Sequence, residues 1–303
     1  MNAIQRRLLQ WYRRQGRSEL PWRTARDPYR TVVSEFMLAQ TQVERVVPKF
    51  EAFVARFPGF APLARATAAD VLREWKGLGY NSRAVRLRRL AHVVVERYGG
   101  KLPAEREQLR VLPGIGPYTA AAIRAFAFDI DDAPVDTNVR RIVNRVFFGL
   151  EYPHRAAPRE LDARARELVP RGRAHDWNSA LMDLGSSVCT ARAPKCLLCP
   201  LRSECASAPV DAALLERLRA AAGANRSPRN GIPFEHTARY ARGRILDRLR
   251  DLPPGRRISL FDLHYSINRA VPGRSMEELS KLVDALTRDG LVTRDGTGVA
   301  LPE

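Results

Sequence analysis

Apolar residues recur every three or four positions along most of the first 205 residues, as in the segment IQRRLLQWYRR. This spacing is typical of amphipathic helices, and stretches such as FPGF, KGLGY and LPGIGP favour turns between them. Because such helices must bury their apolar faces on one another, the pattern predicts a compact all-α domain. The expected helices lie near 31–46, 48–56, 68–75, 82–98, 105–111, 117–127, 137–148, 159–169 and 176–188.

The pattern changes after residue 205. One further helix is expected in VDAALLERLRAAAG, and the composition of ANRSPRNGIPFE (224–235) is typical of a linker. Beyond residue 236 come three more helical segments and then a hairpin around Asp295–Gly296. This order predicts a small winged-helix-like domain. Its expected helices lie near 237–251, 259–268 and 276–288.

Charge indicates a polyanionic partner. The 303 residues include 51 Lys and Arg against 33 Asp and Glu, a formal net charge of +18. Such a balance favours nucleic acid, with a merely basic, soluble surface as the alternative. No apolar run approaches the ~20 residues needed to span a bilayer, and the N-terminus has no secretory pattern. We therefore expect a cytoplasmic monomer without a membrane partner, associated with the nucleoid in a bacterium or archaeon.

The basic residues of the C-terminal segment also form a pattern. Residues 210–303 have 16 basic and 12 acidic residues, so most of the net charge lies before them. Four arginines nevertheless fall on the first helix expected there, where they either grip phosphate or form a solvated face. They are Arg239, Arg242, Arg244 and Arg248.

The cysteines of the chain fall within 17 residues, 189–205, of the stretch SVCTARAPKCLLCPLRSEC. Four thiolates on one short loop can bind a zinc ion or an iron–sulfur cluster, and the spacing alone leaves both possible; four separate structural thiols are the alternative. Arg192 and Lys195 lie in the same loop and can present positive charge to phosphate. The cysteines are Cys189, Cys196, Cys199 and Cys205.

Glu35 lies among apolar residues of a predicted helix. At helical spacing it shares a face with Val32, Phe36, Ala39 and Val43. A carboxylate inside an apolar stripe can hold a proton near neutral pH. A partly exposed glutamate at the edge of the stripe is the alternative.

Asp136 has a different setting, directly before the helical run TNVRRIVNRVF. Aspartate is a favoured N-cap there, and the nearby amides and helix dipole stabilise its ionised form. A capping residue with no further role is the alternative. Taken together, Glu35 and Asp136 form an acid and an anion, a combination that catalytic sites use.

The segment LPGIGPYTA places Gly114 and Gly116 between two predicted helices. Glycines permit close approach of the backbone, and the amides that open the following helix suit a phosphate oxygen. A plain helix–helix turn is the alternative. A dinucleotide fingerprint is excluded because no strand precedes the turn and a third glycine is missing.

These stretches together resemble the helix-hairpin-helix DNA glycosylases with an iron–sulfur loop, the HhH-GPD superfamily, and most closely the MutY adenine DNA glycosylases. The similarity covers about residues 8–206, and its motifs are LPWR, SEFMLAQTQV, GLGY, LPGIGPYTA, VDTNVRR and NSALMDLGSSVC. It implies a two-lobed all-α glycosylase domain at 1–208. Within it, a six-helix barrel covers about 24–134 and a cluster domain combines 1–23 with 135–208. A helix and linker (209–235) and the winged-helix-like domain (236–303) follow.

The resemblance implies catalytic roles for matching residues. Glu35 corresponds to the acid that protonates the adenine leaving group. Asp136 corresponds to the carboxylate that stabilises an oxocarbenium-like sugar, and Asn138 supports the same step. The hairpin with Gly114 and Gly116 corresponds to one that binds DNA phosphate, often together with a monovalent cation.

Other matching positions concern the flipped base and the cofactor. Gln40, Thr41 and Tyr80 correspond to residues that fill or flank the gap around the base and its partner. Arg23 and Asp183 correspond to positions beside the adenine pocket. The four cysteines correspond to the ligands of a 4Fe–4S cluster, which favours iron–sulfur over zinc.

The implied activity is removal of adenine mispaired with 8-oxoguanine or guanine in double-stranded DNA, by base flipping and acid-assisted hydrolysis of the N-glycosidic bond. In the related endonuclease III enzymes a lysine at the position of Tyr118 forms a Schiff base and breaks the strand. Residues 102–194 contain no lysine, so we expect a monofunctional enzyme.

Two alternatives accompany this prediction. The first is a T/G or U/G mismatch glycosylase, which Tyr118 also fits. The second is a non-catalytic DNA-binding regulator, which the presence of both Glu35 and Asp136 disfavours. The tail is helix-rich, whereas MutY enzymes usually carry a Nudix-like β-rich domain that recognises 8-oxoguanine. The sequence therefore leaves the preference for the opposite base open.

Overall fold

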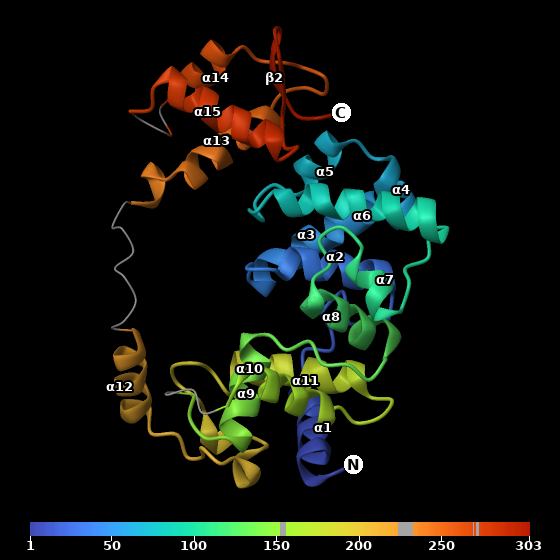
Figure 1. Ribbon diagram of the computed structural model, residues 1–303, viewed down its shortest axis with the longest axis vertical. Coiled ribbons are helices and arrows are strands. Elements are labelled where there is room, and N and C mark those ends of the chain that lie inside the picture. The colour runs from blue at the N-terminus through green and yellow to red at the C-terminus, as the bar shows by residue number, and fades with distance from the viewer. Residues whose placement is uncertain (152–155, 224–232, 269, 271–272) are drawn as a thin grey trace. The chain divides into compact units, whose positions relative to one another are not determined.

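The computed structural model describes residues 1–151, 156–223, 233–268, 270 and 273–303 (Figure 1). The linker predicted at 224–235 lies largely outside them. The described chain is mostly helical with one short antiparallel hairpin, so the all-α prediction is confirmed. None of its helices is both long and apolar enough to cross a membrane.

The chain forms two compact units, each built from separate segments. The first contains Met1–Val32, Pro103–Val111 and Ile115–Pro228. The second contains Val33–Leu102, Leu112–Gly114 and Arg229–Glu303. The C-terminal segment thus groups with residues 33–102, whereas the sequence predicts a separate domain at 236–303.

The core of the first unit lies between α1 (Ala3–Gln15), α9 (Thr137–Phe147) and α11 (Ala174–Ser187). Their apolar faces bury Leu8, Val139 and Trp177 almost completely. A capping box of Asn2 and Gln5 begins α1 and satisfies amides that the first turn leaves free. The unit also contains α7 (Arg106–Arg110), α8 (Pro117–Phe128), α10 (Pro158–Glu167), η1 (Cys196–Leu198), η2 (Arg202–Glu204) and α12 (Ala212–Gly223).

The second unit has an aromatic core. The Phe53 ring meets the Phe57 and Trp75 rings edge to face, with centroids 5.0 and 6.0 Å apart, an arrangement that aromatic pairs prefer. Between residues 33 and 102 this unit contains the end of α2 (Pro28–Leu38), α3 (Val43–Arg56), α4 (Phe60–Arg65), α5 (Ala68–Glu74) and α6 (Ser82–Tyr98). Helix α4 is not among the helices predicted from the sequence, because FPGF favours a turn.

The helix expected at 31–46 is divided in the structure. α2 ends at Leu38, and α3 begins at Val43 and continues through Pro48. The division follows from Arg83, whose guanidinium group donates to three backbone carbonyl oxygens at the end of α2, and from the left-handed backbone of Gln40 (φ +60°). Burial of two phenylalanine rings on α3 offsets the one hydrogen bond that Pro48 cannot make.

The C-terminal part of the second unit has the helices and the hairpin expected from the sequence. Ile245, Leu263 and Val283, one from each longer helix, form its buried centre. Strand β1 (Thr293–Asp295) pairs antiparallel with β2 (Gly298–Ala300), and Ile258 adds a single bridge to Val299. The helical elements are η3 (Phe234–His236), α13 (Ala238–Arg250), α14 (Leu260–Ile267) and α15 (Met276–Arg288).

Candidate functional site

The helix-hairpin-helix segment consists of α7, the turn 111–116 and α8. Asp132, whose side chain is 1% exposed, forms ion pairs with Arg106 of α7 and Arg124 of α8. Arg124 also donates to the carbonyl oxygen of Ala104, at 2.6 Å. Both helices therefore form an ion pair with the same buried carboxylate, which holds α7 and α8 together.

The two glycines of the turn have different structural roles. Gly114 has φ +84°, and a Cβ atom there would lie 2.9 Å from Cζ of Phe36, so both its backbone and its surroundings require glycine. Gly116 is the N-cap of α8, and a Cβ atom there would meet open space. The start of α8 is thus accessible at Gly116, where a helix N-terminus favours an anion.

Glu35 lies on α2 in the second unit, flanked by the buried residues Ser34 and Phe36, and is itself partly buried. Two of the four apolar residues expected to share its face, Ala39 and Val43, lie outside α2. This expectation was wrong because the helix ends at Leu38. The apolar environment of Glu35 on its own helix is therefore smaller than the sequence suggested.

Asp136 is the N-cap of α9 in the first unit. Its Oδ1 accepts hydrogen bonds from the backbone amides of Asn138 and Val139, at 2.8 and 2.7 Å. Its Oδ2 accepts one from Nδ2 of Asn138, at 2.9 Å. Three N–H donors and the helix N-terminus thus hold the carboxylate and oppose its negative charge. The cap predicted from the sequence is present.

Arg141 connects Asp136 and Asn138 to the cysteine loop. One turn further along α9, its Nη2 donates to Oδ1 of Asn138 at 2.8 Å and its Nε donates to the carbonyl oxygen of Cys189 at 2.8 Å. Nη2 also donates to the carbonyl oxygen of Gly185, at 2.8 Å. Burial lowers the pKa of Arg141. Arg141 was not predicted from the sequence, although it stands three positions after Asn138, a spacing that places both on one helical face.

The four cysteines line a single pocket of the first unit, and all are partly buried free thiols. Arg145, 1% exposed, anchors their loop by donating to Thr190 O at 2.8 Å and to Sγ of Cys189 at 3.7 Å. Glu151 pairs with Arg145 at 2.6 Å. Burial raises the pKa of Cys199 to about 11. Within the described residues, no three His, Cys, Asp or Glu side chains are arranged to hold a single metal ion.

Gln40, Thr41 and Tyr80 come from two segments that Arg83 joins. Besides its hydrogen bonds to carbonyl oxygens at the end of α2, Arg83 donates to the carbonyl oxygens of Leu78 and Gly79, each at 3.2 Å. Its Nη2 also lies 3.3 Å from Oγ1 of Thr41. Burial lowers the pKa of Arg83 to about 10.

Among the residues that the structure describes, three that are not glycine have a positive φ: Gln40, Tyr80 and Asp129. Such backbone is strained for a residue with a side chain and is often found at functional sites. Arg83 was not identified from the sequence, since its partners are spread over more than forty positions.

Arg23 and Asp183 form an ion pair, with Nη1 and Oδ2 2.8 Å apart. Arg17 adds three hydrogen bonds to the same carboxylate, from its backbone amide, Nε and Nη2. Burial by itself raises the pKa of Asp183, but the hydrogen bonds and charge of Arg23, together with the hydrogen bonds of Arg17, outweigh burial and leave that pKa below its usual value. The pair ties α11 to the segment that follows α1.

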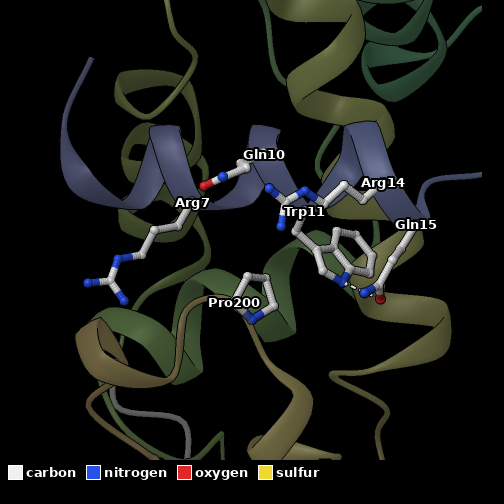
Figure 2. Close-up of a pocket in the computed structure, with 6 residues that line it drawn as sticks. All are labelled: Arg7, Gln10, Trp11, Arg14, Gln15 and Pro200. Carbon is white, nitrogen blue, oxygen red and sulfur yellow. Dashed lines mark hydrogen bonds between the residues drawn. The ribbon is translucent and has the colours of Figure 1, made fainter.

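The cysteine loop also presents polar and apolar groups to solvent. Arg192 and Lys195 are exposed, as are the side chains of Leu197 and Leu198. Beside the loop, an open pocket lies between one face of α1 and Pro200, with the Nε1 of one tryptophan 2.9 Å from a glutamine oxygen (Figure 2). Its lining residues are Arg7, Gln10, Trp11, Arg14, Gln15 and Pro200.

Comparison with known proteins identifies a family match to the middle of the chain and relatives that match almost all of it. The model of the HhH-GPD superfamily of base excision DNA repair proteins matches residues 33–171. The adenine DNA glycosylase of Mycolicibacterium smegmatis is 39% identical over 297 residues, which cover 96% of each chain. That of Mycobacterium tuberculosis (strain CDC 1551 / Oshkosh) is 40% identical over 299 residues, covering 96% of this chain and 93% of the relative.

A solved structure gives a more limited match. The structure of a thermostable thymine-DNA glycosylase has a TM-score of 0.62 and 33% identity, and it covers 67% of this chain and 94% of that one. The mycobacterial alignments, in contrast, span 96% of this chain and therefore include most of the C-terminal helices. The C-terminal part is thus similar in these two mycobacterial proteins.

Proposed function

From its membership of the HhH-GPD superfamily of base excision DNA repair proteins, and of the adenine DNA glycosylases within it, we propose that this chain removes mispaired adenine from DNA. The substrate is double-stranded DNA with adenine opposite 8-oxoguanine or guanine. The observation that carries the proposal is the match to two adenine DNA glycosylases over almost the whole chain. The enzyme acts as a monomer in the compartment that holds the DNA, the cytoplasm or nucleoid.

Recognition begins at the phosphate backbone. The exposed start of α8 at Gly116 offers amides to a phosphate oxygen or, through carbonyl groups of the turn, a site for a monovalent cation. Arg192 and Lys195 add positive charge from the cysteine loop. Extrusion of the base costs a few kcal/mol, which phosphate contacts and side chains inserted into the duplex offset. Gln40, Thr41 and Tyr80 are the residues we assign to that insertion.

Excision then uses the two carboxyl groups. Glu35 donates a proton to a ring nitrogen of adenine, which makes the base a better leaving group. As the N-glycosidic bond breaks, positive charge develops on the sugar, and the carboxylate of Asp136 stabilises it. Asn138 holds that carboxylate through two hydrogen bonds. Water completes the hydrolysis, and Arg23 and Asp183 support the wall of the adenine pocket.

We further assign a 4Fe–4S cluster to the cysteine loop. The donor set fits, because four partly buried thiols line one pocket. Cys189, Cys196, Cys199 and Cys205 would ligate the cluster, which as a redox-capable group with thiolate ligands would hold the loop in shape. Its presence is tested by iron and sulfide analysis of the purified protein, with Cys199→Ser as the comparison.

The position of Tyr118 supports a monofunctional reaction. It is the second residue of α8 and is 36% exposed, and a phenol cannot form a Schiff base with the sugar. Borohydride trapping on a duplex with an adenine mispair should therefore yield little covalent adduct. Trapping as strong as that of a lysine-dependent glycosylase would contradict this assignment.

The decisive experiment is single-turnover excision from four duplexes that differ only in one pair: A·8-oxoguanine, A·G, T·G and U·G. We expect release of adenine, and its loss in Glu35→Gln and in Asp136→Asn. The structural match to a thymine-DNA glycosylase favours the T/G or U/G enzyme as second candidate. Excision from T·G or U·G alone would establish that alternative, and binding without excision from any duplex would establish a non-catalytic regulator.

A further inference from the structure

The C-terminal helices are anchored next to the loop that contains Tyr80. Arg250 of α13 is 8% exposed; its Nε donates to the carbonyl oxygen of Leu72 at 2.9 Å and its Nη2 donates to Oδ1 of Asn81 at 2.6 Å. The side chains of Lys76 and Asp251 form an ion pair at 2.8 Å. Because one partner in each contact lies in the second half of α5 or between α5 and the start of α6, α13 supports residues 77–81, the Tyr80 loop, from one side.

The Tyr80 loop is held in an unusual backbone conformation. Tyr80 has φ +45° and follows glycines 77 and 79, which have φ +93° and +69°, and its side chain remains 40% exposed. Nε1 of Trp75 donates to the carbonyl oxygen of Gly79 at 3.1 Å. A tyrosine avoids the left-handed region unless its surroundings maintain it. The contacts with α13 belong to those surroundings.

Arg239 has a different partner from Arg242, Arg244 and Arg250 of the same helix. Its guanidinium carbon lies 4.2 Å from the centroid of the Tyr80 ring. Arg242 pairs with Asp289, and Arg244 and Arg250 pair with Asp247. Of the four arginines that the sequence places together on this helix, Arg242 and Arg244 thus have carboxylate partners. Within the described residues, Arg239 has an aromatic partner in place of a carboxylate.

We propose that Arg239 is a positioning residue for Tyr80 and that it contacts a phosphate of the DNA beside the Tyr80 loop. A guanidinium over an aromatic ring holds the ring by cation–π attraction and keeps N–H donors for an oxyanion. The C-terminal helices thereby take part in binding the mispair. This inference rests on the proposed function, because it assumes that the Tyr80 loop meets the duplex.

The test uses the full chain with Glu35→Gln, which keeps the duplex intact, and compares Arg239→Ala, Arg239→Lys and Arg242→Ala. Arg242 is the matched control, since it lies on the same helix but pairs with Asp289. Affinity for a duplex with one A·8-oxoguanine pair is measured over a range of salt concentrations. For Arg239→Ala we expect about five- to tenfold weaker binding and a slope of log affinity against log salt shallower by about 0.9. Arg239→Lys should restore the slope, and Arg242→Ala should match the parent.

Two further measurements separate positioning from stability. In the active background, Arg239→Ala should raise the enzyme concentration needed for half-maximal excision and leave the rate at saturating enzyme almost unchanged. Combined with Tyr80→Ala, it should weaken binding by less than the product of the two single effects, because the two groups act together.

Defined outcomes overturn the proposal. An unchanged salt slope in Arg239→Ala, or equal losses in Arg239→Ala and Arg242→Ala, would do so. Failure of the active chain to excise adenine would refute the proposed function separately, while the salt slopes would still decide the role of Arg239.

Discussion

Gly185 is the position where a single methyl group should disturb the candidate catalytic carboxylate from a distance. A Cβ atom there would lie 2.7 Å from Cβ of Asn138 and 3.4 Å from Cδ1 of Ile142. Because the nearest atom is itself a Cβ, rotation of the Asn138 side chain cannot relieve the clash, and α9 or α11 must move. Asn138 donates two hydrogen bonds to Asp136, so the displacement reaches that carboxylate.

The magnitude follows from two opposing effects. Overpacking costs about 1–3 kcal/mol, whereas replacing a helical glycine by alanine stabilises a helix by about 1 kcal/mol. Gly243 of α13 provides the control, because a Cβ atom there meets open space and only the favourable effect remains. Gly185→Ala should thus be about 1–3 kcal/mol less stable than Gly243→Ala. Loss of one charge-assisted hydrogen bond to Asp136 should slow excision about 10- to 100-fold.

The assay pairs urea denaturation of both variants with single-turnover adenine excision at saturating enzyme. DNA affinity should stay close to that of the parent, because the atoms that a Cβ atom at Gly185 would meet belong to Asn138 and Ile142, to which we assign no DNA contact. If Gly185→Ala were as stable and as fast as Gly243→Ala, the proposed link between α11, Asn138 and Asp136 would be refuted.

Three further predictions follow from neighbouring features. Gly114→Ala should lose about 1–3 kcal/mol of stability, because Gly114 has a positive φ and a Cβ atom there would lie too close to Phe36. Gly116→Ala should keep its stability and bind duplex DNA less tightly. The reverse result would contradict the roles assigned to the two glycines. The pKa of Asp183 is lowered, so its stabilising contribution is present above about pH 4, the unfolded value, and disappears as pH falls through the native pKa. Asp183→Asn should be less stable at pH 7 by about 3 kcal/mol and show a weaker acid dependence of urea denaturation. Arg141→Met should slow excision more than it weakens DNA binding, measured on one A·8-oxoguanine duplex.

Features that depend on nearby residues could be predicted from the sequence. Asp136 is an N-cap because its side chain reaches amides two and three positions further on, so aspartate before a helical run is sufficient evidence. The helix expected at 82–98 appears as α6 with those bounds. The cysteines line one pocket because they follow one another along a short loop.

Features that depend on distant partners could not be predicted. The end of α2 at Leu38 is determined by Arg83, which lies 47 positions from one of the carbonyl groups it binds. Within α2 and the following residues, apolar spacing alone favours continuation of the helix. Likewise, Arg250 meets Leu72 across 178 positions, and no local pattern indicates that the C-terminal helices pack on α5. Composition revealed many arginines but not which of them are buried.

The hydrogen bonding of several arginines within the protein changes the interpretation of the net charge of +18. Arg83, Arg141, Arg145 and Arg250 each donate to backbone carbonyl oxygens at the end of a helix or in a loop. A guanidinium with five N–H donors can satisfy several such groups at once, and buried carbonyl oxygens require partners. These arginines therefore shape the segments that hold Tyr80, Asp136 and the cysteine loop, and their charges contribute little to binding DNA phosphates. The phosphate contacts must come from the smaller set that stays exposed, so the salt dependence of DNA binding should be weaker than the formal charge suggests.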